Sequence, residues 1–282
     1  MNQHAEKTGT FQTEDGLSLF YRQILPGKKP VKDRILINHG IGESSETYEY
    51  LIDALSKASY EIWIYEMRGH GKSPGVRGHA GSIDELVRDL NSFINHINPG
   101  NRKIFLLGHS LGGLVVLNYI MNYGDNKIKA LIVNGAGLLV EETPVLKVKK
   151  IIGILLRSIA PSLTMDTGIK NDTLSSFTEY LEKRAKNKLL HTKVSASLGI
   201  ALINEGKQIL SGAKKITLPI FITHGGDDKI VNPEGSALLF EKVSSTDKKL
   251  HIYSGLKHEI YNENKKKVFS ELIEWMNKHI DE

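Results

Sequence analysis

A serine flanked by glycines is the residue in this sequence most clearly arranged for chemistry. Ser110 lies in the segment GHSLG, with an apolar strand pattern before it and a helical pattern after it. A strand that turns directly into a helix holds its apex residue in a strained conformation, and larger flanking side chains would collide with the crossing backbone. The spacing therefore predicts a hydroxyl presented at the top of a sheet, in the position of a nucleophile.

A serine nucleophile needs a base to accept its proton and a carboxylate to orient that base. With this kind of turn, the acid and then the base follow the serine on loops after later strands. The loop after the next-to-last expected strand carries Asp227 and Asp228, and either suits the role. Of the three later histidines, His251 lies within a strand pattern and His279 lies near the end of the last helix. His258, in a glycine-containing loop after the last strand, is the expected base.

Acyl transfer also places negative charge on the substrate carbonyl oxygen, which fixed backbone N–H groups stabilise. Leu111 follows the serine at the start of a helix, where the dipole favours an anion, so its N–H is one expected donor. The other is the N–H of Ile41, in the glycine-rich loop HGIGES that follows an earlier strand. These positions predict covalent catalysis of acyl transfer.

The elements that must position these residues alternate between strand and helix patterns. Helices are expected at 44–57, 82–95, 111–120, 234–243 and 266–279, and strands at 34–38, 60–66, 103–107, 128–134, 218–223 and 249–253. The segment Glu14-Asp15-Gly16 between two alternating runs predicts a hairpin. Strands joined by helical crossovers indicate an α/β fold with a doubly wound, mostly parallel sheet and helices on both faces.

One segment interrupts this alternation. Roughly 80 residues between Gly135 and Leu218 show no strand pattern and predict several helices, which is too much for a simple crossover. We expect a helical cap, or lid, at 138–215 inserted into a core formed by 1–137 and 216–282. One helical stripe of its most apolar part consists of Val145, Val148, Ile152, Leu155 and Ile159. This stripe either packs on neighbouring helices or forms a lip that contacts lipid.

The composition bounds the remaining possibilities. The chain has 282 residues, 40% hydrophobic and 24% charged, with a net charge of +5, which is typical of a globular protein with a solvated surface. Cysteine is absent, which excludes disulfides and thiol catalysis and fits a cytoplasmic protein. The N-terminal residues lack the pattern of a signal peptide, and no apolar run approaches the ~18 residues of a membrane span. No motif indicates a metal, another cofactor or a nucleic-acid partner, and the oligomeric state is not predicted.

Five motifs together resemble the monoacylglycerol lipase and lysophospholipase group of α/β-hydrolases, which is grouped with the serine aminopeptidase-like hydrolases. They are HGIGE at 39–43, RGHGKS at 68–73 with RGH at 77–79, GHSLGG at 108–113, HGGDDKIV at 224–231 and YSGLKHE at 253–259. The match begins near residue 9, continues to the C-terminus and is weakest in the expected cap. In this group the acid directly precedes a basic residue, so the resemblance selects Asp228, which precedes Lys229.

The resemblance implies an α/β-hydrolase fold with the triad Ser110, Asp228 and His258, and an oxyanion hole formed by the N–H groups of Ile41 and Leu111. It implies no cofactor, and a serine carboxylester hydrolase that cleaves the acyl ester of a monoacylglycerol or lysophospholipid through an acyl-enzyme. The cap would then contact a membrane surface transiently. The alternatives are a short-chain esterase of broad specificity, a peptide-hydrolysing aminopeptidase-like enzyme, and a non-catalytic binding protein on the same fold.

Overall fold

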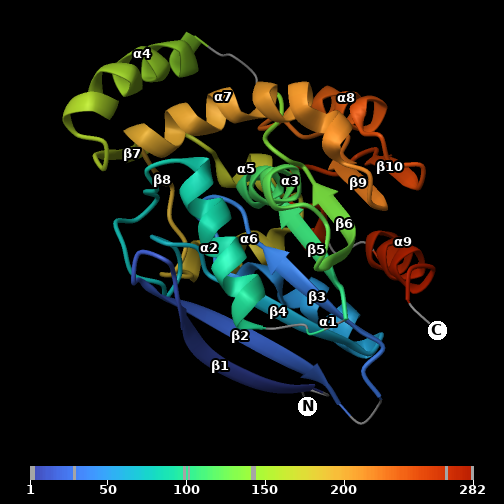
Figure 1. Ribbon diagram of the computed structural model, residues 1–282. Coiled ribbons are helices and arrows are strands. Elements are labelled where there is room, and N and C mark those ends of the chain that lie inside the picture. The colour runs from blue at the N-terminus through green and yellow to red at the C-terminus, as the bar shows by residue number, and fades with distance from the viewer. Residues whose placement is uncertain are drawn as a thin grey trace.

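An eight-stranded sheet forms the centre of the molecule (Figure 1). The computed structural model describes residues 4–27, 30–97, 100, 102–140, 144–263 and 266–280, and only the backbone of 144–150. The strands, in their order across the sheet, are β1 (His4–Gln12), β2 (Ser18–Pro26), β4 (Tyr60–Tyr65), β3 (Asp33–Asn38), β5 (Ile104–His109), β6 (Ile128–Asn134), β9 (Ile220–Gly225) and β10 (Lys248–Tyr253). From β4 to β10 every neighbouring pair is parallel, whereas the β1–β2 hairpin joins antiparallel. The predicted α/β sheet is confirmed.

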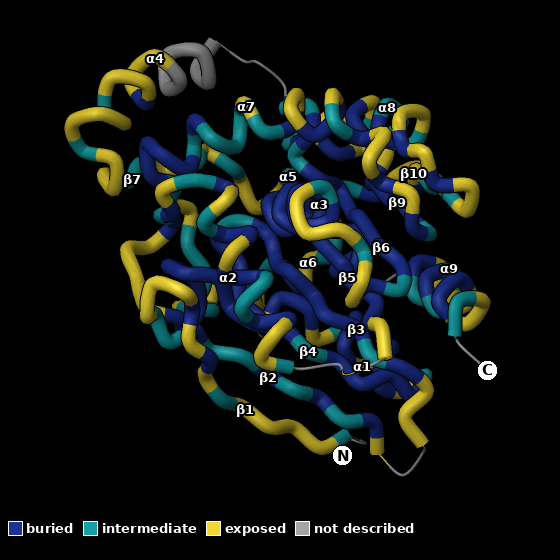
Figure 2. The backbone as a smooth tube through the Cα atoms, in the orientation of Figure 1, coloured by how far each residue is buried: buried dark blue, intermediate teal, exposed yellow. Residues whose placement is uncertain are grey.

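Helices cover both faces of this sheet and create two hydrophobic cores (Figure 2). One core lies under α1 (Glu49–Lys57) and α9 (Lys266–Asn277). The other lies under α2 (Ile83–His96), α3 (Leu111–Tyr123) and α8 (Glu234–Lys242). Helix α3 is buried from Leu111 to Ile120 because it packs between the sheet and the helices outside it. Strands covered on both faces read as continuous apolar runs, which is why β5 and β6 were recognisable in the sequence.

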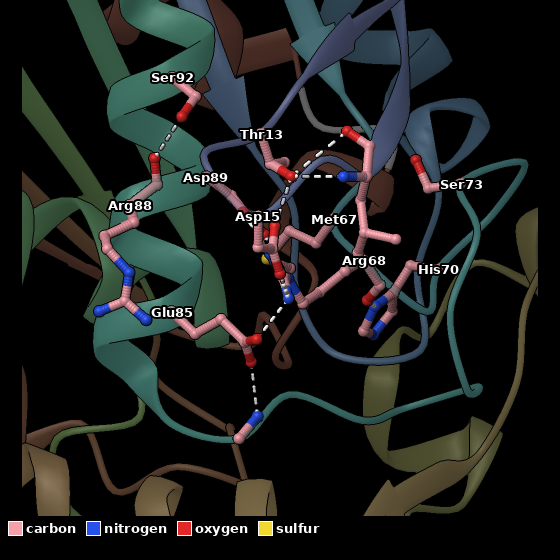
Figure 3. A network of polar contacts seen from close by, with 12 residues as sticks. Thr13, Asp15, Met67, Arg68, His70, Ser73, Glu85, Arg88, Asp89 and Ser92 are labelled. Carbon is pink, nitrogen blue, oxygen red and sulfur yellow. Dashed lines mark hydrogen bonds and ion pairs between the residues drawn. The ribbon is translucent and has the colours of Figure 1, made fainter.

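The loop after β4 is tied to the β1–β2 turn and to α2 by one buried cation (Figure 3). The Arg68 guanidinium donates two hydrogen bonds of 2.6 Å to Asp89 and further bonds of 2.9 and 3.0 Å to Asp15, and it also pairs with Glu85. Three carboxylates compensate for burying this charge. The predicted start of α2 is also present, since the Ser82 hydroxyl accepts a hydrogen bond from the Glu85 N–H at 3.2 Å.

The segment between β6 and β9 lies over the sheet and α3 (Figure 1). It contains α4 (Pro144–Ile159), β7 (Thr164–Asp166), α5 (Asn171–Leu174), α6 (Thr178–Lys186), β8 (Lys193–Ser195), α7 (Ala196–Gly212) and the 3₁₀ turn η2 (Ala213–Lys215). The expectation of helices alone is wrong, because β7 and β8 pair antiparallel. Strands of three residues, joined only across the intervening helices, are too short to leave a periodic signal. The expected single helix at 44–57 is also divided, into a 3₁₀ turn η1 (Ser45–Tyr48) and α1.

Candidate active site

Ser110 occupies the sharp turn between β5 and α3. Its backbone has φ 53° and ψ −117°, a sparsely populated conformation that costs about 1–3 kcal/mol. A Cβ at Gly112 would lie 2.1 Å from the Asn38 carbonyl oxygen, and one at Gly108 would lie 2.4 Å from the Gly112 carbonyl oxygen. These contacts are with backbone atoms that cannot swing away. The two glycines are therefore required sterically by the turn that presents Ser110.

The loops after β9 and β10 bring an acid and a histidine together. His258 Nδ1 donates a hydrogen bond of 2.6 Å to Asp228 Oδ2, which leaves Nε2 as the ring nitrogen for a serine hydroxyl. The other carboxylate oxygen, Oδ1, accepts from the N–H groups of Ile230 and Val231 at 2.8 and 3.0 Å. Burial works to raise the pKa of Asp228, but the neighbouring His258 and these hydrogen bonds hold it well below its usual range. The carboxylate is thus ionised and fixed in orientation.

A second histidine, His224, holds the same carboxylate. Its Nε2 lies 3.0 Å from Asp228 Oδ2, and its Nδ1 lies 2.7 Å from the Ser236 hydroxyl. The sequence placed His224 in the acid loop but gave no sign of this contact, because Ser236 comes from α8. Asp227, the other candidate acid, is exposed, and its N–H donates to the Leu256 carbonyl at 2.8 Å. The structure therefore brings Asp228, and not Asp227, to His258.

The two expected oxyanion donors lie on the loop after β3 and at the first residue of α3. Ile41 and Leu111 line the same cavity as Ser110, and the first N–H groups of a helix have no partner within it. The Glu43 carboxylate fixes the loop by accepting 2.7 Å bonds from the Gly40 N–H and the Tyr48 hydroxyl. These bonds hold the backbone of the loop in place, as donors to an oxyanion would require.

The cavity beside Ser110 has a volume of about 590 Å³ and is mainly apolar. Val194, Ala196, Ile200, Leu202 and Ile203, from β8 and α7, supply much of its apolar wall. This size suits a small-molecule ligand with an aliphatic chain. Within the described residues no cluster of His, Asp and Glu is placed to bind a metal ion, and no described helix is long and apolar enough to cross a membrane.

A mostly parallel sheet that carries a serine, an aspartate and a histidine on these three loops is the arrangement that defines the class of α/β-hydrolases. Residues 29–265 match the family described as serine aminopeptidase, S33. The chain belongs to this family, and the resemblance inferred from the five motifs is confirmed.

Three known proteins show how far the similarity extends. An uncharacterised abhydrolase domain-containing protein of Dictyostelium discoideum is 30% identical over 95% of this chain, which spans only 29% of that longer protein. A monoacylglycerol lipase of Mycolicibacterium smegmatis is 28% identical, with 96% of this chain and 97% of that protein covered. The structure of a soluble variant of the Saccharomyces cerevisiae monoglyceride lipase, in complex with a substrate analog, has a TM-score of 0.85 and 27% identity, and covers 96% of this chain and 95% of that one.

Proposed function

We propose that the protein is a serine carboxylester hydrolase that cleaves a lipid ester with one acyl chain, a monoacylglycerol or a lysophospholipid. The observation that carries this proposal is the strained Ser110 beside an apolar cavity, with a carboxylate-bound His258 on the neighbouring loop. The similarity to monoacylglycerol lipases supports the acyl ester as the substrate. Residues 138–215 act as the cap that shelters the acyl chain.

We assign a role to each of the five residues. Ser110 attacks the ester carbonyl while His258 Nε2 takes the hydroxyl proton, which it then gives to the leaving alcohol. Asp228 holds the ring in the correct tautomer and stabilises its protonated form. The N–H groups of Ile41 and Leu111 hold the oxyanion, and loss of one such donor typically costs about 2.7–4 kcal/mol. Water releases the fatty acid from the acyl-enzyme by the same steps in reverse.

The cap also presents an apolar surface that suits transient contact with a membrane. Ile151, Leu155 and Ile159 on α4 are 62%, 64% and 83% exposed, and this helix lies at the outer side of the cap (Figure 2). Ile152 of the expected stripe is also exposed, whereas the side chains of Val145 and Val148 lie outside the described residues. Exposed apolar side chains gathered on one helix favour insertion into the lipid interface.

The lack of cysteine supports the cytoplasm as the location.

A substrate panel tests the proposal. Monoacylglycerols, lysophospholipids, short p-nitrophenyl esters and amino-acid amides are compared at one enzyme concentration, with Ser110→Ala as the control. We expect fatty-acid release from the first two classes, lowered at least about a thousand-fold in Ser110→Ala. Turnover of the amides alone would support a peptidase instead. Failure of a fluorophosphonate to label the wild-type serine would point to a non-catalytic binding protein.

A further inference from the structure

Four buried ionisable side chains adjoin the residues of the candidate site, and we call them the buried quartet. They form two contacts, Glu43 Oε1 to His109 Nε2 at 3.4 Å and Glu259 Oε1 to Arg184 Nη1 at 3.2 Å. The Glu43, His109 and Glu259 residues are 2–3% exposed, and the Arg184 side chain is 9% exposed. Charges this deep are retained only when they are compensated.

Each member of the quartet adjoins a different part of the site. His109 directly precedes Ser110, and Glu259 directly follows His258. Glu43 fixes the loop of Ile41 through its bond to the Gly40 N–H. Arg184 alone comes from the cap, where it is held on α6 and donates a 3.2 Å hydrogen bond to the Tyr180 hydroxyl. The quartet therefore connects the nucleophile, the oxyanion loop, the base loop and the cap.

Glu259 has its cationic partner only while α6, which carries Arg184, is docked. Burial works to lower the pKa of His109, but Glu43 and then Glu259 hold it above its ordinary value. Burial likewise works to raise the pKa of Glu43. His109 and, to a smaller extent, Arg184 outweigh this effect and hold the pKa well below its ordinary value. His109 and Arg184 thus each face one of the two carboxylates, and Arg184 is the permanent cation of the four. Removal of Arg184 leaves one buried carboxylate without a cation, adjacent to the base.

The cap makes other contacts with the base loop at the same place. The Glu259 N–H donates to the Leu174 carbonyl at 2.9 Å, and the Ser176 N–H donates to the Glu263 carboxylate at 3.0 Å. The His258 ring contacts Asp228 from the acid loop and the His109 ring, whose centre is 4.7 Å away. Glu259, which pairs with Arg184 of the cap, is the next residue in the chain. The Tyr48 and Tyr180 hydroxyls complete the polar lining of the quartet.

We propose that Arg184 is a positioning residue, through which docking of α6 balances the charge beside His258 and sets this base for Ser110. The cap then controls the base as well as sheltering the substrate. The inference rests on the proposed function, since it assigns His258 the role of base. The inference requires that breaking the Arg184–Glu259 contact changes the pH dependence of the reactivity of Ser110. A purely structural arginine would not have this effect.

The experiment measures the rate at which a fluorophosphonate labels Ser110 between pH 5 and pH 9. In Arg184→Met the unpaired Glu259 carboxylate favours the protonated form of His258. We therefore expect the acid limb of the profile to shift to higher pH by about one unit, so that labelling at a given pH on that limb is about ten-fold slower. Arg184→Lys retains the cation and should remain near wild type. Arg184→Met combined with Glu259→Gln removes both charges and should return the limb toward its original position.

The control and the contrary outcomes separate this inference from the function. Lys183→Met removes an exposed cation from the same helix, paired with Glu179 at 2.7 Å, and should leave the profile unchanged. Should Arg184→Met fail to fold, Glu259→Gln alone is expected to move the limb to lower pH. An unmoved limb in both variants overturns the inference. If the wild type is not labelled at all, the proposed function fails, and NMR titration of the His258 ring in the same variants then decides the inference.

Discussion

The carboxylate of Asp228 does more than contact His258, the proposed base, because four donors converge on it. Two are histidine ring nitrogens and two are the N–H groups of Ile230 and Val231. A carboxylate held in this way stays ionised and keeps Nδ1 of His258 protonated, which leaves Nε2 as the ring nitrogen that can accept a proton. Asp227 is adjacent in sequence but exposed, and the two residues form a natural matched pair for experiment.

We expect Asp228→Asn to lower kcat about 10⁴-fold, because an amide can hold His258 in the wrong tautomer. Asp227→Asn should retain at least half of the wild-type activity, since surface substitutions away from such contacts have small effects. Hydrolysis of a short p-nitrophenyl ester measures both. The reverse ranking of the two variants would remove Asp228 from the proposed triad.

At this scale the sequence predicted the residues whose neighbours carry a local signature. Ser110, Ile41 and Leu111 follow from glycine patterns and from the start of a helix, and His258 follows from its place after the last strand. Physical reasoning from the sequence did not decide which of Asp227 and Asp228 is the acid. It missed His224 and Arg184, because their partners lie in distant parts of the chain and only the fold defines the contact.

Among the elements, the stretch between α6 and β8 connects the proposed cap to the loops after β3 and β4. The His191 N–H donates to the Gly42 carbonyl at 3.1 Å, and the ring Nε2 lies 3.1 Å from the Gly69 carbonyl oxygen. Gly42 has φ +71°, and a Cβ there would lie 2.0 Å from the His191 carbonyl oxygen. The rings of His39, His70 and His191 follow one another with centres 5.2 and 4.8 Å apart.

This histidine row predicts loss of stability in acid. Burial, with Arg77, His39 and Lys193 nearby, lowers the pKa of His191 to about 4. The unfolded chain takes up this proton near pH 6.5, so the stabilisation is complete above about pH 6.5 and is lost as the pH falls toward 4. His191→Gln should therefore show a smaller fall in Tm between pH 7.5 and pH 5 than the wild type.

Thermal melts at the two pH values check this prediction, with exposed His96→Gln as the control that keeps the wild-type pH dependence. Equal falls in Tm for wild type and His191→Gln would contradict it.

The sequence identified α2 through its Ser82 cap and the core strands through their apolar runs. It could not identify β7 and β8, since three residues per strand hold no period and their pairing depends on the packed cap.

For the molecule as a whole, the sequence predicted the layered architecture but not which side of the cap faces solvent. The apolar stripe of α4 was compatible with packing and with lipid contact. In the structure α4 packs on α7 through Gly153, where a Cβ would lie 3.1 Å from Ile200, while its isoleucine and leucine side chains remain largely exposed. Exposure depends on the assembled neighbours, which no local pattern encodes.

The proposed membrane contact predicts weaker binding to lipid when this face is made polar. We expect Leu155→Glu with Ile159→Glu to lower the fraction bound to vesicles of phosphatidylcholine and phosphatidylglycerol at least about ten-fold, because each buried leucine or isoleucine contributes about 1.5–3 kcal/mol. Val76→Glu changes an apolar residue of 50% exposure outside the cap and should bind as the wild type does. Vesicle flotation measures binding, and unchanged flotation of the double variant would contradict the proposal.

The point at which the proposed cap joins the sheet has a consequence for how such enzymes diversify. The chain leaves the sheet after Asn134 and returns at Ile220, and the two strands concerned, β6 and β9, are hydrogen-bonded neighbours. An insertion that starts and ends on adjacent strands can change in length at small entropic cost, about 0.6 kcal/mol for each doubling. Selection can therefore exchange or lengthen this insertion while the strands that precede Ser110, Asp228 and His258 stay unaltered.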